Sequence, residues 1–235
     1  MFKLIPVGTN GLYPQKGKPT SCYLVQVGER NIVLDMGSGS FSRLAEIVAP
    51  EKIDLIIVSH FHLDHCADLG VFGYYMQRRE KKRLFCPDDP HAAAVFGLEK
   101  LFDVTYISEG KTEVYSGVIV EFLRTNHPVK TYAVRITAEG KTLSYTADTN
   151  VCDNLERLFS SSDLVISDSA FLYKDWAENK PHISASHCGR LSSKYGVKTL
   201  LSHLDPAIDK REVLTEAREF SELTELIEND KIYYL

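Results

Sequence analysis

The sequence contains no Cys-x-x-Cys pair, and its five cysteines are an odd set that cannot all be joined in disulfides. Odd, widely spaced cysteines favour reduced thiols over a disulfide framework. They indicate a reducing compartment, and we expect the protein to lie in the cytoplasm. The five are Cys22, Cys66, Cys86, Cys152 and Cys188.

Long apolar runs are also missing. The stretch from Met1 to Val7 is short and apolar, without a basic start, a long apolar core or a small-residue cleavage site, so we expect no secretory signal there. No segment reaches the ~20 apolar residues that a membrane-spanning helix needs. We therefore expect no membrane partner.

The sequence also has no excess of basic residues. It contains 27 lysines and arginines and 32 acidic residues, which gives a formal net charge of -5. Long nucleic acids bind through broad basic surfaces that release counterions, so this balance argues against them as partners. A small phosphate-bearing substrate stays compatible, since bound divalent ions would offset the acidic charge locally.

What is present is enough apolar sequence for one sizeable core. With 235 residues and 44% hydrophobic content, we expect a single domain covering residues 1–235. β-branched and aromatic runs alternate with amphipathic stretches, which predicts an α/β architecture. The expected strands cover residues 3–7, 21–27, 31–34, 54–59, 84–87, 104–107, 117–123, 132–136, 141–146, 164–166, 198–202 and 232–235, and the expected helices cover 41–48, 67–79, 155–160, 185–195 and 210–220.

The most informative feature is a cluster of metal-capable side chains directly after the expected strand 54–59. His60, His62, Asp64 and His65 fall within six positions. Side chains in extended chain alternate between faces, so His60 and His62 can share one ion. Asp64 and His65 come around the following turn toward a second ion. Imidazole and carboxylate are zinc ligands, and paired ions activate water, so the cluster predicts a two-metal hydrolase.

Further ligand-type residues follow other expected strands. His127, Asp148, Asp168 and His203 each come shortly after a strand, as His60 does. Rigid strands fix the origins of the side chains in the loops that follow them. We therefore expect these residues to converge on one site.

The pattern His60-x-His62-x-Asp64-His65 resembles the motif of the metallo-β-lactamase superfamily. A later lone histidine, an aspartate in Thr146-Ala147-Asp148 and a terminal histidine at His203 continue the resemblance in the family's order, over essentially the whole chain. The resemblance implies a four-layer αβ/βα sandwich. It also implies two divalent metal ions, zinc with manganese as the alternative, and a metal-bridging hydroxide as nucleophile. The implied ligands are His60, His62 and His127 for one ion, Asp64, His65 and His203 for the other, and Asp148 for both.

A finer resemblance is to the phosphodiesterase branch that includes the tRNA 3′-processing endonucleases. It is carried by the opening Gly8-Thr9 loop, the Pro19 to Tyr23 segment and the element His182-Ile183-Ser184-Ala185. The resemblance implies that Asp64 and His182 are catalytic, with His182 helping the leaving group depart. The stretch from His127 to Asp148 is too short for the tRNA-clamping arm of those enzymes. We therefore expect a small or short phosphodiester substrate, and the resemblance implies a homodimer.

The same residues are compatible with other functions. The same metal pair could serve a thioester or lactone hydrolase, or the chain could be a metal-binding or redox module without hydrolytic activity. Asp168 and His187 are undecided between site and packing. The aromatic residues around Phe171 and Trp176 could wall a pocket, although packing is the favoured reading, and Cys66 is expected to point into the core.

Overall fold

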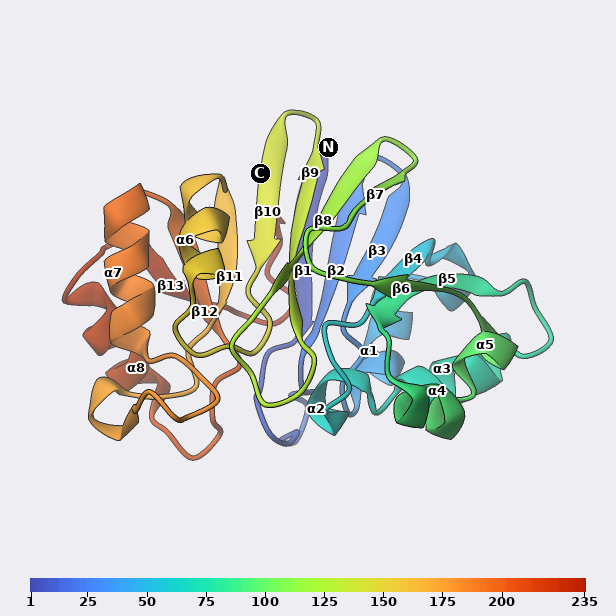
Figure 1. Cartoon of the computed structure of the whole chain (residues 1–235), viewed down its shortest axis with the longest axis horizontal. Coiled ribbons are helices and arrows are strands. Elements are labelled where there is room, and N and C mark those ends of the chain that lie inside the picture. The colour runs from blue at the N-terminus through green and yellow to red at the C-terminus, as the bar shows by residue number, and fades with distance from the viewer. The chain divides into compact units, whose positions relative to one another are not determined.

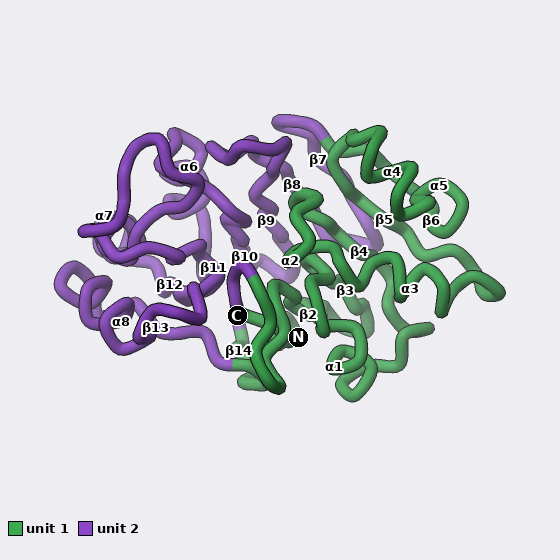
Figure 2. The backbone as a smooth tube through the Cα atoms, turned by 90° about the horizontal axis from the view of Figure 1, so that it is seen from below, with its two compact units in different colours: residues 1–9, 13–107, 229–234 green, residues 10–12, 108–228, 235 purple.

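The computed structural model describes residues 1–235 and divides the chain into two compact units (Figure 2). Each unit has one seven-stranded mixed sheet and helices of its own. No helix is both long enough and apolar enough to cross a bilayer. Unit 1 comprises Met1–Thr9, Tyr13–Ile107 and Asn229–Tyr234, and unit 2 comprises Asn10–Leu12, Ser108–Glu228 and Leu235.

The sheet of unit 1 has the strand order β14-β1-β2-β3-β4-β5-β6. Strands β14 to β3 pair antiparallel and strands β3 to β6 pair parallel. Parallel neighbours need crossover connections, which the intervening helices supply. The strands are β1 (Phe2–Gly8), β2 (Cys22–Val27), β3 (Arg30–Leu34), β4 (Leu55–Ile57), β5 (Lys82–Pro87), β6 (Phe102–Ile107) and β14 (Tyr233–Tyr234).

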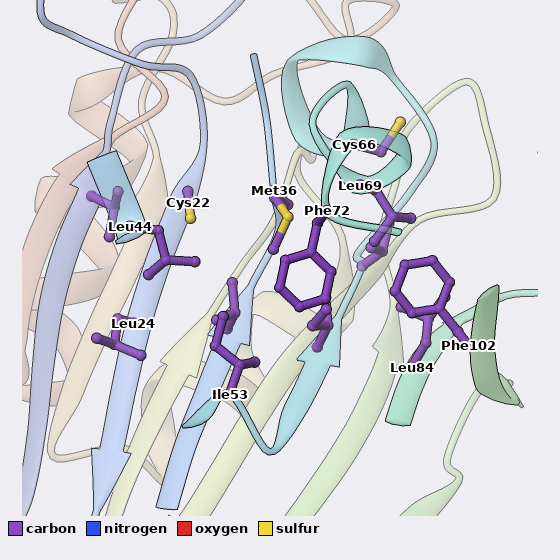
Figure 3. Packing of buried hydrophobic residues seen from close by; sticks show 14 of the residues in the cluster. Cys22, Leu24, Met36, Leu44, Ile53, Cys66, Leu69, Phe72, Leu84 and Phe102 are labelled. Atoms are coloured by element: carbon purple, nitrogen blue, oxygen red, sulfur yellow. The ribbon is translucent and has the colours of Figure 1, made fainter. Parts of the chain in front are cut away.

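Helices of unit 1 pack their apolar residues against this sheet. Phe72 lies beside Met36 over the strands (Figure 3), and its ring stacks on that of Phe102 with centroids 6.2 Å apart. Full burial of such a side chain stabilises the fold by about 1.5–3 kcal/mol. The helices are α1 (Ser40–Ile47), η1 (Pro50–Lys52), α2 (Leu63–Cys66), α3 (Leu69–Met76), α4 (Pro90–Phe96) and α5 (Leu98–Leu101).

The sheet of unit 2 has the order β13-β12-β11-β10-β9-β8-β7. Strands β7 to β10 form an antiparallel meander, and β10 to β13 run parallel. The strands are β7 (Thr112–Tyr115), β8 (Val118–Arg124), β9 (Tyr132–Ala138), β10 (Lys141–Tyr145), β11 (Leu164–Asp168), β12 (Lys198–Ser202) and β13 (Thr224–Leu226).

Three helices and a 3-10 turn complete unit 2, and Figure 1 shows the three helices next to the parallel strands of this unit. Ser184 caps the longest of them, since its hydroxyl accepts the backbone N–H of His187, and Gly196 ends it in the left-handed conformation (φ 62°). The bounds of this helix agree with the helix expected over residues 185–195. The elements are α6 (Asp153–Ser160), η2 (Tyr173–Asp175), α7 (Ala185–Tyr195) and α8 (Lys210–Arg218).

The predicted helix 67–79 is wrong in its bounds, because the chain forms two shorter helices, α2 and α3, with a break at Ala67 and Asp68. The carboxylate of Asp68 accepts the backbone N–H of Phe41 at 2.9 Å, which draws this residue to α1. Six other short elements were not predicted at all: α4, α5, β7, β13 and the 3-10 turns η1 and η2. The other expected strands and helices are present, with ends shifted by a few residues.

Four of the five thiols are buried, and burial raises their pKa: the pKa values of Cys86 and Cys188 reach about 12, and those of Cys22 and Cys66 rise further. Cys66 packs in the core as expected. Cys152 is half-buried. A rise from about 8.5 to about 12 lowers the thiolate fraction roughly a thousandfold, and the thiolate is the reactive form.

We therefore expect a thiol reagent at pH 8 to modify one cysteine of the native protein rapidly, Cys152, and all five after unfolding in guanidinium. Peptide mapping identifies the site. As the pH rises above about 8.5, thiols of the unfolded chain ionise first, so the free energy of unfolding should fall at alkaline pH. Rapid native modification of a second cysteine would contradict the packing described here.

Candidate metal centre

The ligand cluster of unit 1 follows β4 and turns into α2. The Nε2 atom of His60 lies 3.1 Å from Nδ1 of His62, and the rings of His60 and His65 have centroids 4.2 Å apart. Two nitrogen ligands at about 2.0–2.1 Å from one tetrahedral zinc ion are separated by roughly 3.3 Å, so His60 and His62 fit one ion. A carboxylate oxygen of Asp64 lies 3.7 Å from Nε2 of His65. The structure thus brings these four predicted ligands together.

A buried carboxylate that was not predicted, Asp35, orients this cluster from behind. It follows β3 in the left-handed conformation (φ 58°), and one of its oxygens lies 2.7 Å from Nδ1 of His65. The same carboxylate accepts the N–H and the hydroxyl of Ser59, whose oxygen is 3.0 Å from Nδ1 of His60. With Nδ1 of both histidines directed to these partners, their Nε2 atoms are presented for metal binding.

Gly37 lets the chain after β3 approach the ligand turn closely. A Cβ atom at this position would lie 2.1 Å from the carbonyl oxygen of Asp64, so any side chain would displace the turn. Next to it, the N–H of Met36 donates to the carbonyl of His65 at 2.8 Å. The glycine and this backbone bond together hold the turn that carries Asp64 and His65.

The ligand cluster of unit 2 is centred on Asp148. Its carboxylate oxygens lie 3.3 Å from Nδ1 of His203 and 3.9 Å from Nε2 of His127. Asp148 follows β10, His203 follows β12 and His127 follows β8. All three residues are buried. The prediction that these strand ends converge is confirmed for these residues of unit 2.

Two residues of this cluster region have backbone conformations that L-residues rarely adopt. His203 (φ 54°) and Ala147 (φ 51°) are left-handed, which costs about 1–3 kcal/mol at such positions. A Cβ atom at Gly11, which belongs to the same unit, would lie 2.9 Å from the His203 ring, so only glycine fits beside it. The chain therefore holds His203 against an intrinsic preference, as functional sites often do.

His127 is fixed by its second ring nitrogen. Its Nδ1 donates to the carbonyl oxygen of Pro181 at 3.1 Å. The other ring nitrogen, Nε2, lies on the side of Asp148 and is the atom that could bind a metal ion. The hydroxyl of Thr125 donates to the backbone carbonyl of Asp148 at 2.9 Å and ties the loops after β8 and β10 together.

His182 and Asp168 form a buried pair in unit 2. Nδ1 of His182 lies 2.8 Å from Oδ2 of Asp168, which also accepts the backbone N–H of Thr149, while Oδ1 accepts the backbone N–H of Ala170. The His182 ring stacks on that of His203 with centroids 5.0 Å apart. Ligand atoms of Asp148, Asp168 and His182 lie within 4.8 Å of one another. Asp168 is the last residue of β11, and its carboxylate is the group that contacts Nδ1 of His182.

His187 lies outside this pair. Its Nδ1 is 2.8 Å from the Ser184 hydroxyl, and its ring contacts Trp176 with centroids 4.5 Å apart. Burial has the largest effect on the pKa of His187 and lowers it. Nearby Arg190 lowers this pKa further, and Glu216 opposes both effects. Trp176 stacks on Tyr173 with centroids 5.9 Å apart, and Tyr173 is exposed, so the core packing that was favoured is not found for Tyr173.

Buried imidazoles and carboxylates at strand ends of mixed sheets define a metal-dependent hydrolase of the α/β sandwich class. A sequence profile described as "Beta-lactamase superfamily domain" matches residues 30–203, and the chain belongs to this superfamily. The predicted fold class, the metallo-β-lactamase sandwich, is confirmed. The chain is a metal-dependent hydrolase.

Named relatives agree with this assignment. The chain is 31% identical over 216 residues to the "Probable metallo-hydrolase YhfI" of Bacillus subtilis, covering 86% of this chain and 87% of that protein. The crystal structure of YhfI superposes with a TM-score of 0.93 over 99% of this chain and 98% of that chain, at 27% identity. Two more distant structures share the fold: the short form of human tRNase Z (TM-score 0.79, 15% identity, 99% and 98% covered) and a diphosphatase of the PhnP family (0.80, 14%, 100% and 98%).

Proposed function

We propose that the chain hydrolyses phosphodiesters with two divalent metal ions held by the residues that match the superfamily motif. Superfamily membership and the order of the ligands along the chain support this assignment. The nitrogen-rich donor set fits zinc, with manganese as the alternative. His60, His62 and His127 would hold one ion, Asp64, His65 and His203 the other, and Asp148 both.

The observation that favours a phosphodiester over a thioester is the His182 and Asp168 pair, and the related structures named above favour a phosphoryl substrate over a lactone. The alkoxide that leaves a phosphodiester is strongly basic and needs a proton, whereas the thiolate of a thioester has a conjugate acid near pKa 8.5 and departs without one. His182 is buried, stacked on the ligand His203 and oriented by Asp168. A fixed imidazole in this position suits the protonation of an alkoxide.

In the proposed mechanism, two ions held by these residues would, when bound, supply an activated water and stabilise the charge that builds on the phosphoryl oxygens. The Asp168 carboxylate accepts a hydrogen bond from Nδ1–H of His182. Nε2 of His182 is therefore the atom that would donate a proton to the leaving oxygen. Asp35 and the Pro181 carbonyl fix the rings of His65 and His127 during turnover, because each binds the nitrogen opposite the ligand atom.

The substrate is proposed to be small or short. Between His127 and Asp148 the structure has only the hairpin of β9 and β10, as the length of this stretch predicted. The formal charge of -5 argues against a long nucleic acid. The names of the related structures, a tRNase and a diphosphatase, support a substrate with phosphoryl groups. Cytoplasmic location and a homodimer stay predictions.

Elemental analysis and a substrate panel test the assignment. We expect two equivalents of metal, hydrolysis of bis(p-nitrophenyl) phosphate above any thioester or lactone, and loss of at least about 100-fold in activity with a chelator, reversed by zinc or manganese. Chelated enzyme without added metal is the control. If the metal-loaded protein cleaved a thioester or lactone and no phosphodiester, the acyl-hydrolase alternative would replace this proposal.

A further inference from the structure

Asn150 is a buried amide whose hydrogen bonds join three loops of unit 2. It lies two residues after Asp148 and is 1% exposed. Its Oδ1 accepts from Nε1 of Trp176 at 2.8 Å and from the N–H of Val151 at 2.7 Å. Its Nδ2 donates into a cage of three backbone carbonyls, those of Ala177 (2.9 Å), Glu178 (3.2 Å) and Lys180 (2.6 Å).

The chemistry of these partners fixes which way the amide points. An indole N–H and a backbone N–H can only donate, and backbone carbonyls can only accept, so the oxygen must face Trp176 and the NH₂ group must face the carbonyls. No other neutral side chain of this size presents two acceptor sites and two donors at once. The side chain is therefore matched to the segment 176–180.

That segment leads directly into two groups of the candidate site. Pro181 supplies the carbonyl that binds Nδ1 of His127, and His182 follows it. The backbone N–H of Asn150 also donates to the carbonyl of Asn126 at 2.7 Å, beside His127. One residue thus ties the loop after β10 to the loop after β8 and to the loop after β11.

We propose that Asn150 is a positioning residue that holds the segment 176–182, and through it places His182 for proton transfer and His127 for metal binding. The proposal rests on the proposed phosphodiesterase function for its kinetic readout. Asn150 is not one of the assigned metal ligands, and its side chain bonds to backbone groups and to the Trp176 indole. Without its NH₂ group, the segment loses the bonds that keep Pro181 and His182 at their present distances from His127 and Asp168.

Asn150→Asp is the sharpest test, because it keeps an oxygen facing Trp176 and puts a carboxylate oxygen, which accepts and can carry charge, where the NH₂ group donated. We expect kcat for a phosphodiester to fall about 10–100-fold with KM changed less than about threefold, and zinc affinity, measured by chelator competition, to fall about 10–100-fold. Asn154→Asp is the matched control: Nδ2 of Asn154 donates to the carbonyl of Arg124 at 2.8 Å, away from the segment. The control should stay within about twofold of wild type.

The only tryptophan of the chain gives a readout independent of activity. Trp176 lies in the segment, so acrylamide quenching of its fluorescence should increase in Asn150→Asp and stay unchanged in Asn154→Asp. If Asn150→Asp does not fold, hydrogen exchange of the Trp176 indole N–H in the wild-type protein tests the bond to Asn150 instead. This bond should make the exchange much slower than that of an exposed indole.

The two proposals fail in different ways. A folded Asn150→Asp protein with wild-type kcat, zinc affinity and quenching would overturn the positioning role, as would rapid exchange of the wild-type indole N–H. An inactive wild-type protein would overturn the phosphodiesterase assignment alone, while zinc affinity and Trp176 quenching would continue to test the positioning of His127.

Discussion

An Asp148→Ala protein is expected to lose phosphodiester hydrolysis by at least about 1,000-fold. Its carboxylate is buried with its oxygens 3.3 Å and 3.9 Å from ring nitrogens of His203 and His127. Charge stabilisation by bound ions contributes several kcal/mol, and about 1.4 kcal/mol corresponds to a factor of ten in rate. The measurement is kcat/KM with bis(p-nitrophenyl) phosphate, together with the metal content of the purified variant.

Asp153→Ala is the matched control, since Asp153 is an exposed aspartate of the same unit. It should keep wild-type activity and two equivalents of metal. His62→Ala, which removes a ligand from unit 1, should lower activity as Asp148→Ala does if both units serve one centre. Full activity of a folded Asp148→Ala protein would refute the ligand assignment. The thermal midpoints of the metal-free proteins should differ by only a few degrees.

The candidate ligands of unit 1 could be recognised in the sequence because they lie close together along the chain. His60, His62, Asp64 and His65 lie within one short stretch, and a chelate needs only the spacing that the strand and turn provide. The remaining ligands could be placed because each follows a recognisable apolar strand. Their mutual distances in unit 2 depend on the sheet order, which the sequence pattern does not contain.

Orienting residues were harder to predict because each acts through a partner distant in sequence. Asp35 reads as a turn residue after a strand, and its role arises only because β3 and β4 are parallel neighbours, which places Asp35 against Ser59 and His65. The pairing of Asp168 with His182 likewise depends on how the loop after β11 folds back. An aspartate at the end of an apolar strand is a sequence signal for both Asp35 and Asp168. This signal does not indicate which histidine each carboxylate contacts.

Missed and misplaced elements have physical reasons as well. The edge strands β7 and β13 have four and three residues, too few for a clear alternating pattern. Helix α4 begins at Pro90 and is capped by Asp89, a combination that also signals a turn. The left-handed conformations of Asp35, Ala147 and His203 run against residue preference, so only the surrounding packing determines them.

A His182→Gln protein should distinguish proton donation from other roles of this residue. Protonation of a leaving group contributes about 100- to 10,000-fold when that group is a poor one. We therefore expect hydrolysis of an alkyl phosphodiester to fall by about this factor. Hydrolysis of bis(p-nitrophenyl) phosphate should fall by less than about tenfold, because nitrophenolate leaves without a proton. The variant should bind the same amount of metal as wild type, since His182 is not an assigned ligand.

The slope of log kcat against the pKa of the leaving group, measured over a series of aryl and alkyl phosphodiesters, should be steeper for His182→Gln than for wild type. Asp168→Asn should give an intermediate slope and lose about 10–100-fold on the alkyl substrate, because it removes the carboxylate that holds Nδ1 of His182 at 2.8 Å. Equal losses on all leaving groups would mean that His182 stabilises charge or binds substrate, and the proton-donor role would then be withdrawn.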